Sequence, residues 1–170
     1  IYSSDLVNLG KYYHENRTNI HYNYLPKSLI NALIATEDER FFEHSGIDIR
    51  ALGRVFKGVV TGNLKGGGST ITQQLAKLLF PRKKLTKFEF ALRKIKEWII
   101  ASKLEKNYTK EEILTMYLNK FDFLNNAVGI NSASQVYFNK TPSQLALHES
   151  AMLVGMAKNP SLFNPVRRPD

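Results

Sequence analysis

Four acidic side chains gather within residues 37–43 of a chain that is otherwise basic. They are Glu37, Asp38, Glu39 and Glu43 in the segment EDERFFEHSG, whereas the whole sequence of 170 residues contains 24 Lys and Arg against 15 Asp and Glu. A carboxyl group exchanges protons near neutral pH only where its surroundings oppose its charge. The face of the helix on which each acid lies therefore decides what it can do.

Glu37 lies on the apolar side of the helix that its neighbours predict. Ile30, Leu33, Ile34 and Phe41 share its helical face by their spacing. A carboxylate on such a face is costly unless it is paired, and burial favours its protonated form, which suits a general base or acid. A structural ion pair with a Lys or Arg is the alternative. The other three acids are expected on flanking or opposite faces, in contact with water.

His44 follows the acids at the end of the same segment. A lone histidine after a helix usually caps it or packs against it. Glu37, Asp38 and His44 could be imagined as three metal ligands, but they match no usual ligand spacing. The sequence therefore predicts no metal site built from these side chains.

A glycine run precedes a further predicted helix in GGGSTITQQLAK, residues 66–77. Ser69 and Thr70 place hydroxyl groups at the entry to this helix, where backbone N–H groups also suit a phosphate. The run is not a Walker A loop, because Gly68 stands where that motif requires Lys. A flexible connection is the alternative. Lys77 lies one to two turns into the helix.

Arg93, Lys94 and Glu97 share one face of a predicted amphipathic helix, opposite Ile95 and Ile99. A solvated face with weak ion pairs is the alternative to a binding site. The surrounding cations are dense within residues 82–96: Arg82, Lys83, Lys84, Lys87, Arg93, Lys94 and Lys96. Leu85, Phe88 and Phe90 alternate with them, which suits an anionic membrane surface. Nucleic acid is the competing partner, although no nucleic-acid-binding motif is present.

Periodicity and end signals predict a mainly α domain with a minor β element at the front. Helices are expected from Pro26 to about Phe41, over 49–60, over 71–80, from Phe88 to about Leu104, after a capping box at Thr109–Glu112, and over 145–157 after a box at Thr141–Gln144. The helix after the first box should bury Ile113, Leu114, Tyr117 and Leu118. Residues 1–24 are predicted to be a linker or short strands, including 19–24, before a domain at 25–170.

Composition narrows the classes of protein further. The absence of cysteine excludes disulfides and thiolate chemistry, and a hydrophobic content of 43% excludes disorder. No apolar run has the length of a membrane span, and the first residues do not form a signal peptide, so any anchor is expected outside this chain.

Taken together, four segments resemble one family. The segment EDERFFEHSG is similar to the motif E-D-x-x-F-x-x-H-x-G, and GGSTITQQLAK is similar to G-x-S-T-I-T-Q-Q with a following lysine. Further along the chain, RKIKEWIIASKLE is similar to R-K-x-x-E-x-x-x-A-x-x-L-E, and KEEILTMYLN is similar to K-x-x-I-L-x-x-Y-L-N. They are identified with the peptidoglycan glycosyltransferase domain (glycosyltransferase family 51) of class A penicillin-binding proteins and monofunctional glycan polymerases. The resemblance runs from Leu25 to Pro165, with mild departures at His148, Gly155 and Lys158.

The resemblance implies a lysozyme-like α fold beside a small membrane-associated jaw, here roughly residues 48–90. It implies an enzyme that polymerises lipid II into β-1,4 glycan, with inversion and release of undecaprenyl diphosphate. The place would be the outer (periplasmic or extracellular) face of the bacterial cytoplasmic membrane. The two ends look more like a bifunctional protein, with a transpeptidase domain and an N-terminal anchor outside this chain.

The resemblance also assigns roles to residues. Glu37 becomes the catalytic base, and Glu97 a second glutamate that orients Lys94 or assists the leaving group. The implied substrate-binding residues are Asp38, His44, Ser69, Thr70, Gln73, Gln74, Lys77, Arg93, Lys94 and Asn119. No cofactor is obligatory; Mg²⁺ or another divalent cation could assist the diphosphate, but the sequence contains no dedicated cage for it.

Two other functions remain open at this point. A lysozyme-like hydrolase or lytic transglycosylase also uses a buried helical Glu, but it needs no site for a lipid diphosphate. A non-catalytic module that binds anionic lipid or glycan would retain its function without the Glu37 carboxylate.

Overall fold

A computed structural model describes residues 4–5, 18–63, 67–79 and 87–167. Its elements are η1 Tyr22–Tyr24, α1 Lys27–Glu37, α2 Ile49–Thr61, α3 Ile71–Leu78, α4 Lys87–Asn107, α5 Lys110–Lys120, α6 Ile130–Phe138, η2 Pro142–Gln144 and α7 Leu147–Lys158. The extended backbone within these residues pairs only at an isolated bridge between Asp122 and Val128. The prediction of a mainly α domain is confirmed, and the architecture is consistent with a lysozyme-like fold.

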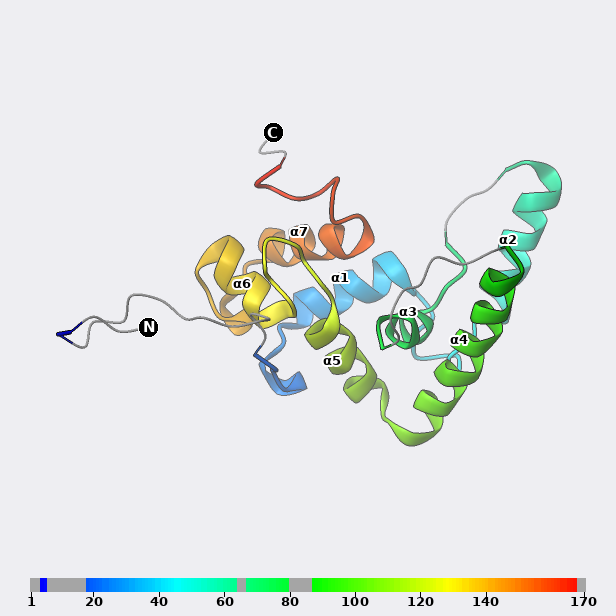
Figure 1. The fold of residues 1–170 in the computed structure, drawn as a ribbon, viewed down its shortest axis with the longest axis horizontal. Coiled ribbons are helices and arrows are strands. Elements are labelled where there is room, and N and C mark those ends of the chain that lie inside the picture. Colours follow the sequence, from blue (N-terminus) through cyan, green and yellow to red (C-terminus); the bar gives the residue numbers. More distant parts are fainter. Residues whose placement is uncertain (1–3, 6–17, 64–66, 80–86, 168–170) are drawn as a thin grey trace.

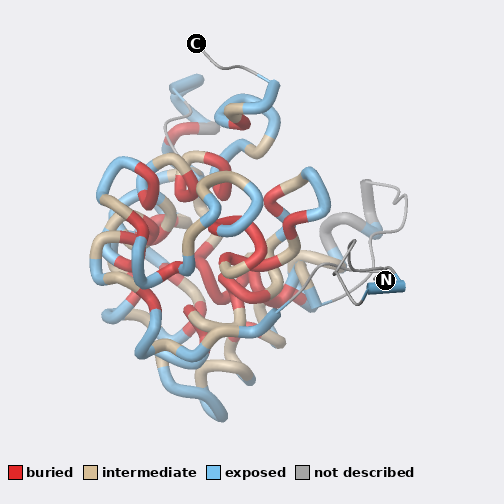
Figure 2. The backbone as a smooth tube through the Cα atoms, turned by 90° about the vertical axis from the view of Figure 1, so that its left-hand side faces the viewer, coloured by how far each residue is buried: buried red, intermediate tan, exposed pale blue. Residues whose placement is uncertain are grey.

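The hydrophobic core lies among α1, α3, α5, α6 and α7. Helix α1 packs against α7, and α3 packs against both α4 and α5, while α2 and α4 lie on the side of the molecule away from α6 (Figure 1). Leu33, Leu75, Tyr117 and Leu153 come from four different helices and are each 0% exposed. Figure 2 shows the buried backbone gathered at the centre of the molecule.

Helix α1 is shorter than its periodicity predicts. It ends at Glu37 instead of continuing to Phe41, because Asp38 leaves the helical region at φ −160° and its carboxylate accepts the N–H of Ile71. Phe41 is nevertheless fully buried, since the turn that follows returns its ring to the core. The early end of α1 places Glu37 at the last position of the helix.

The first predicted capping box is confirmed. Thr109 and Glu112 cap α5 reciprocally, and α5 buries the four residues expected to face the core. The second box, Thr141–Gln144, is also present, but it caps the short η2 rather than a long helix. Helix α7 begins later than predicted, where the Glu149 carboxylate accepts the Ala146 N–H at 2.7 Å.

Helix α4 has its polar face inward. Glu97 is 5% exposed, whereas Leu92, Ile95 and Ile99 are 43, 50 and 51% exposed. The apolar stripe that the sequence places on this helix is thus its outer face. The predicted cations Arg82, Lys83 and Lys84, together with Leu85, lie outside the described residues, as do the side chains of Lys87, Phe88 and Phe90.

Residues 19–24 were predicted to be a short strand or a linker, and of these two alternatives the strand is not found. Tyr22–Tyr24 form η1, and Ile20 is held in place by its N–H and C=O, which both pair with the Asn119 side-chain amide at 2.9 Å. This pairing uses the amide of a side chain from α5 in place of a neighbouring strand. Within the described residues, no helix is both long and apolar enough to span a bilayer.

Candidate active site

A cleft of about 380 Å³ opens at the C-terminal end of α1. It is lined by Ala35, Thr36, Glu37, Asp38, Glu39, Arg40, Asp48, Ala51, Arg54, Gly67, Gly68, Ser69, Thr70, Gln74 and Lys158. Its walls therefore come from the end of α1, the start of α2, the glycine loop, α3 and the end of α7. The acid cluster and the glycine loop, which the sequence singles out separately, meet in one site.

One oxygen of the Glu37 carboxylate has a hydrogen-bond partner and the other has none among the described residues. Its Oε2 accepts a hydrogen bond from Gln74 Nε2 at 2.8 Å. Its Oε1 is buried, and no hydrogen-bond donor reaches it from the described part of the chain. A buried acceptor without a donor is unusual in folded proteins and is often found where a ligand completes the site. Glu37 pairs with no Lys or Arg in the described residues, so the structural ion-pair alternative is not supported.

Gln74 connects Glu37 to the core. The Tyr117 hydroxyl, on the fully buried α5 side chain, donates to Gln74 Oε1 at 3.1 Å. Burial, and secondarily the charge of Glu37, raise the pKa of the Tyr117 phenol above its ordinary value. The hydroxyl therefore remains protonated and able to donate. Tyr117 was expected only as a core residue.

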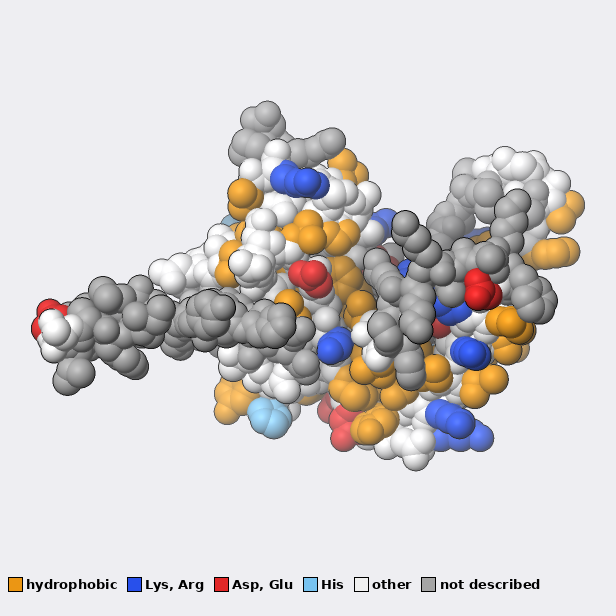
Figure 3. Space-filling view, in the orientation of Figure 1, with side chains coloured by type: hydrophobic (Ala, Val, Ile, Leu, Met, Phe, Trp, Pro, Cys, Tyr) orange, Lys and Arg blue, Asp and Glu red, His pale blue; other side chains and the backbone are white. Residues whose placement is uncertain are grey.

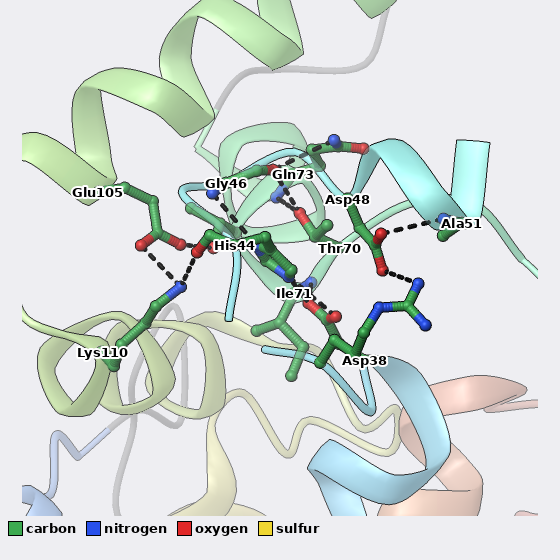
Figure 4. Close-up of polar contacts among 12 residues, drawn as sticks. Asp38, His44, Gly46, Asp48, Ala51, Thr70, Ile71, Gln73, Glu105 and Lys110 are labelled. Atoms are coloured by element: carbon green, nitrogen blue, oxygen red, sulfur yellow. Dashed lines mark hydrogen bonds and ion pairs between the residues drawn. The ribbon is translucent and has the colours of Figure 1, made fainter. Parts of the chain in front are cut away.

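Asp38 is buried, which corrects the expectation that water reaches it. It is 7% exposed, and its carboxylate accepts the Ile71 N–H and the His44 Nε2–H, each at 3.0 Å. The Gly46 N–H donates to His44 Nδ1 at 3.1 Å, so the ring proton is on Nε2. Figure 4 shows Asp38 and His44 joined between the end of α1 and the start of α3. Both predicted substrate-binding side chains are engaged within the protein.

The Gly46 carbonyl fastens the turn after α1 to α3. Thr70 Oγ1 donates to it at 2.7 Å and Gln73 Nε2 at 3.2 Å, and both of these side chains are buried (Figure 4). Gly46 has φ +89°, and a Cβ there would lie 2.9 Å from the backbone C and O of Ala101 in α4. Only glycine fits this turn. Thr70 and Gln73 thus hold the glycine loop and α3 in position.

Lys110 completes this framework and was not predicted as a site residue. Its Nζ donates to the His44 carbonyl at 2.6 Å, pairs with Glu105 at 2.8 Å and lies 4.4 Å from the centre of the Phe41 ring. Glu105 also accepts a hydrogen bond from Thr72 Oγ1 at 2.5 Å. The sequence could have indicated these two residues through the segments that resemble the family, since Glu105 ends RKIKEWIIASKLE and Lys110 begins KEEILTMYLN.

Lys94 brings the inner face of α4 to the cleft. Its Nζ donates to Ser69 Oγ at 3.2 Å, and Ser69 lines the cleft. Glu97 pairs with Lys94 at 2.8 Å and with Arg93 Nε at 3.3 Å. Arg93 Nη2 is buried and has no hydrogen-bond partner among the described residues. Because Glu97 is buried, the alternative of a solvated face is wrong for this helix.

Glu37, Asp38, Ser69, Thr70 and Gln74 line the cleft, whereas the other seven predicted site residues, among them Lys77 and Asn119, do not. Lys77 is exposed on α3 and does not line it. Asn119 uses its amide to hold Ile20, as described above. Conversely, Arg54 and Lys158 line the cleft and were not predicted as site residues. Lys158 had been noted only as a position that differs from the usual sequence of the family.

Arg40 and Asp48 stabilise the wall of the cleft next to α2. They pair at 2.6 Å, and Asp48 Oδ1 accepts the Ala51 N–H at 2.9 Å. Although burial acts in the opposite direction, these hydrogen bonds hold the pKa of the Asp48 carboxyl below its ordinary value. Asp48 therefore fixes the start of α2 as an anion.

An apolar surface lies on the outside of α4 and α2. Ile47, Ile95, Trp98 and Ile99 line a shallow groove together with Ser102, Lys103 and Lys106. On α2, Ile49, Phe56 and Val60 are exposed as well. Figure 3 shows hydrophobic side chains and cations side by side on this part of the molecule. We call the outward residues of α2 and α4 the outer face.

Comparison with known proteins places the chain in a family. The family model described as Transglycosylase matches residues 5–170. The chain belongs to this family.

Its relatives include penicillin-binding protein 1F of Bacillus subtilis, 46% identical over 159 residues, which are 93% of this chain and 22% of the relative. Penicillin-binding protein 1A of Escherichia coli is 41% identical over 167 residues, 98% of this chain and 19% of the relative. Penicillin-binding protein 2a of Streptococcus pneumoniae is 46% identical over 142 residues, 84% of this chain and 18% of the relative. The chain thus spans about a fifth of the length of the curated relatives it matches.

Proposed function

We propose that this domain is a peptidoglycan glycosyltransferase that polymerises lipid II into β-1,4 glycan for cell wall synthesis. Membership of the transglycosylase family supports the reaction class. The observation that carries the proposal is the buried, unpartnered Oε1 of Glu37 in a cleft that Ser69 connects to Lys94. One site thus offers a proton acceptor and a cationic region.

In the reaction, the 4-hydroxyl of one sugar attacks the anomeric carbon of the lipid-linked chain. Glu37 Oε1 takes the hydroxyl proton as the new C–O bond forms. The bond between the anomeric carbon and the diphosphate oxygen breaks, and undecaprenyl diphosphate leaves with the electron pair. A single in-line displacement inverts the anomeric configuration from α to β.

The leaving diphosphate needs positive charge and hydrogen-bond donors rather than a strong acid. Lys94 and Arg93 provide the charge on the inner face of α4, and the Ser69 hydroxyl provides a donor from the glycine loop. Glu97 orients both cations through its two ion pairs. Arg54 and Lys158 add positive charge to the cleft itself.

Two carboxylates that line the cleft are already engaged within the protein. Asp38 and Asp48 already accept N–H groups and pair with His44 and Arg40. No cluster of three or more candidate ligand side chains occurs in the described ranges. A divalent cation that assists the diphosphate, as Mg²⁺ could, would therefore be held mainly by the oxygens of the substrate and by water.

The outer face fits the surface of the membrane that holds the substrate. Exposed Ile95, Ile99 and Phe56 would enter the boundary of the acyl chains, while Lys103 and Lys106 would meet lipid phosphates. We place the domain on the outer face of the bacterial cytoplasmic membrane. The relatives are about five times longer than this chain, which supports further domains in the full-length protein; we expect these to include a transpeptidase domain and an anchor.

Turnover of lipid II in detergent, with product length resolved on a gel, tests the function. Wild type should form polymer, and Glu37→Gln should abolish it while keeping the melting temperature. Glu43→Gln is the matched control, because Glu43 is exposed in the same segment and does not line the cleft. Cleavage of added glycan without polymer formation would indicate a hydrolase instead. Polymer formation by Glu37→Gln at the wild-type rate would show that Glu37 is not the base, and no turnover by the wild type would indicate a non-catalytic binding module.

A further inference from the structure

We propose that Tyr117 is a positioning residue that orients the base Glu37 through the side-chain amide of Gln74. The inference rests on the proposed function, because it assigns a role in the same site. It concerns a side chain from the core helix α5, which does not line the cleft.

The direction of the two hydrogen bonds follows from their chemistry. An ionised Glu37 carboxylate only accepts, so the Gln74 group that faces it at 2.8 Å is the NH₂. Gln74 Oε1 then faces Tyr117, whose hydroxyl must donate at 3.1 Å. If the amide turned over, an oxygen would face the carboxylate and the NH₂ would face the phenol. The Glu37 carboxylate sets this orientation, and the Tyr117 hydroxyl holds the amide in it by donating to Gln74 Oε1.

Glu37 needs this donor because of where it lies. It is the last residue of α1, and the end of a helix presents carbonyl groups rather than N–H groups. The helix dipole also disfavours a negative charge there. Gln74 donates the one hydrogen bond that Glu37 accepts among the described residues, and it engages only Oε2. Oε1 is thereby left for the substrate hydroxyl.

Packing alone does not explain the hydroxyl of Tyr117. The ring lies 5.7 Å from the Phe121 ring centre, and the side chain is 0% exposed. A phenylalanine would fill the same space without a polar atom to satisfy. The hydroxyl has a partner because Gln74 turns its oxygen toward the core.

Tyr117→Phe tests the inference, since it removes one oxygen atom and keeps the ring. Turnover of lipid II should show kcat reduced about 5- to 50-fold with KM changed less than about twofold, as expected for a misoriented base. Tyr137→Phe is the matched control. Its hydroxyl is also hydrogen-bonded, donating to the Phe123 carbonyl at 2.7 Å and accepting from Asn125 Nδ2 at 3.1 Å, and neither of these groups contacts Glu37. Its kcat should equal that of wild type.

A double-mutant cycle shows whether Tyr117 acts through Gln74. In a Gln74→Ala background, Tyr117→Phe should change kcat by less than about twofold, because the connecting amide is already absent. An equal loss of kcat in both backgrounds would overturn the inference, as would a Tyr117→Phe single variant with wild-type kcat.

A measurement without substrate separates this inference from the proposed function. In protein labelled with ¹⁵N-glutamine, the side-chain NH₂ signals of Gln74 should shift in Tyr117→Phe and in Glu37→Gln, and should remain in place in Tyr137→Phe. Unchanged Gln74 signals in Tyr117→Phe would overturn the inference even if lipid II is polymerised. Shifted signals in a protein that does not turn over lipid II would support the hydrogen-bonded chain and reject the function.

Discussion

The Asp38 carboxylate accepts the backbone N–H of Ile71 at 3.0 Å and so joins the end of α1 to the first residue of α3. This bond places Glu37, the residue before Asp38, opposite Gln74, one turn into α3. The geometry of the base therefore depends on a neighbour that has no chemical step of its own.

Asp38→Asn should destabilise the fold and lower activity. The amide places an NH₂ group where one carboxylate oxygen accepts, so this group faces the N–H of Ile71 or of His44 at about the same distance, at a cost of about 1–3 kcal/mol. Urea unfolding measures the change. Asp122→Asn is the control, because exposed Asp122 also accepts a backbone N–H, from Leu124 at 2.9 Å, and its loss should have little effect. Equal destabilisation by both variants would contradict the role of Asp38.

Gly46→Ala should be among the most destabilising single-methyl changes in the chain. The added Cβ would meet the Ala101 backbone at 2.9 Å, and the residue has φ +89°. The combined clash and strain should cost about 2–5 kcal/mol of unfolding free energy. Gly53→Ala in α2 is the matched control: a Cβ there has no neighbour within 4 Å, and the change should stabilise by about 0.5–1 kcal/mol. A neutral Gly46→Ala would show that α4 can move away from this turn.

Lys94→Gln should impair the departure of the diphosphate. Removing a cation that faces developing negative charge should lower kcat by about 10²–10³-fold. Lys96→Gln removes the same charge from the exposed side of α4 and should retain most activity. The pair is compared by initial rates of polymerisation at one ionic strength. If both variants lose activity equally, the general charge of α4 matters rather than the position of Lys94.

The Asp48 carboxyl should make stability depend on pH at the acidic end. Its pKa in the folded protein is lowered from the model-compound value of 3.8. The stabilisation is therefore fully present above that value and is lost as pH falls through the lower folded-state pKa. Urea unfolding of wild type and of Asp48→Asn is compared between pH 6 and pH 3. The difference between their unfolding free energies should narrow only below about pH 4. A gap that already narrows between pH 6 and pH 5 would assign the effect to other groups.

The outer face should be required for binding to membranes. The double variant Ile95→Ser and Ile99→Ser removes exposed apolar surface. Each isoleucine side chain would contribute about 1.5–3 kcal/mol to the free energy of membrane binding if it were fully buried in the bilayer. Co-sedimentation with vesicles of anionic phospholipid should fall at least about tenfold. Leu147→Ser is the control, because Leu147 is 71% exposed on α7, away from the outer face. Equal loss in the control would mean that vesicles bind without a preferred face.

Local signals in the sequence predict some elements well. The box at Thr109–Glu112 and the four apolar positions after it define α5, because capping and helical spacing involve residues that are close in the chain. Glu37 could also be placed at a site, since its helical face and its family-like segment agree. In these cases the contacts that decide the structure lie within a few residues.

Contacts between distant segments account for the errors. Asp38 is buried because Ile71 and His44 need an acceptor, and α1 ends early for the same reason. The apolar stripe of α4 faces outward because the opposite face is buried, with Glu97 paired there to Arg93 and Lys94. Tyr117 was recognised as a core residue. Its hydrogen bond to Gln74 joins residues 43 positions apart, and helical periodicity gives no signal for such a contact.

The inverted helix α4 sets a geometric limit on what can approach the site. One wall of α4 carries the cations next to Ser69, and the opposite wall carries Ile95 and Ile99. A helix with its side chains is about 10 Å thick. Any bilayer that covers the outer wall would therefore lie only one helix thickness from the cationic region. A lipid-linked substrate could then place its diphosphate beside these cations while its tail stays in the hydrocarbon layer.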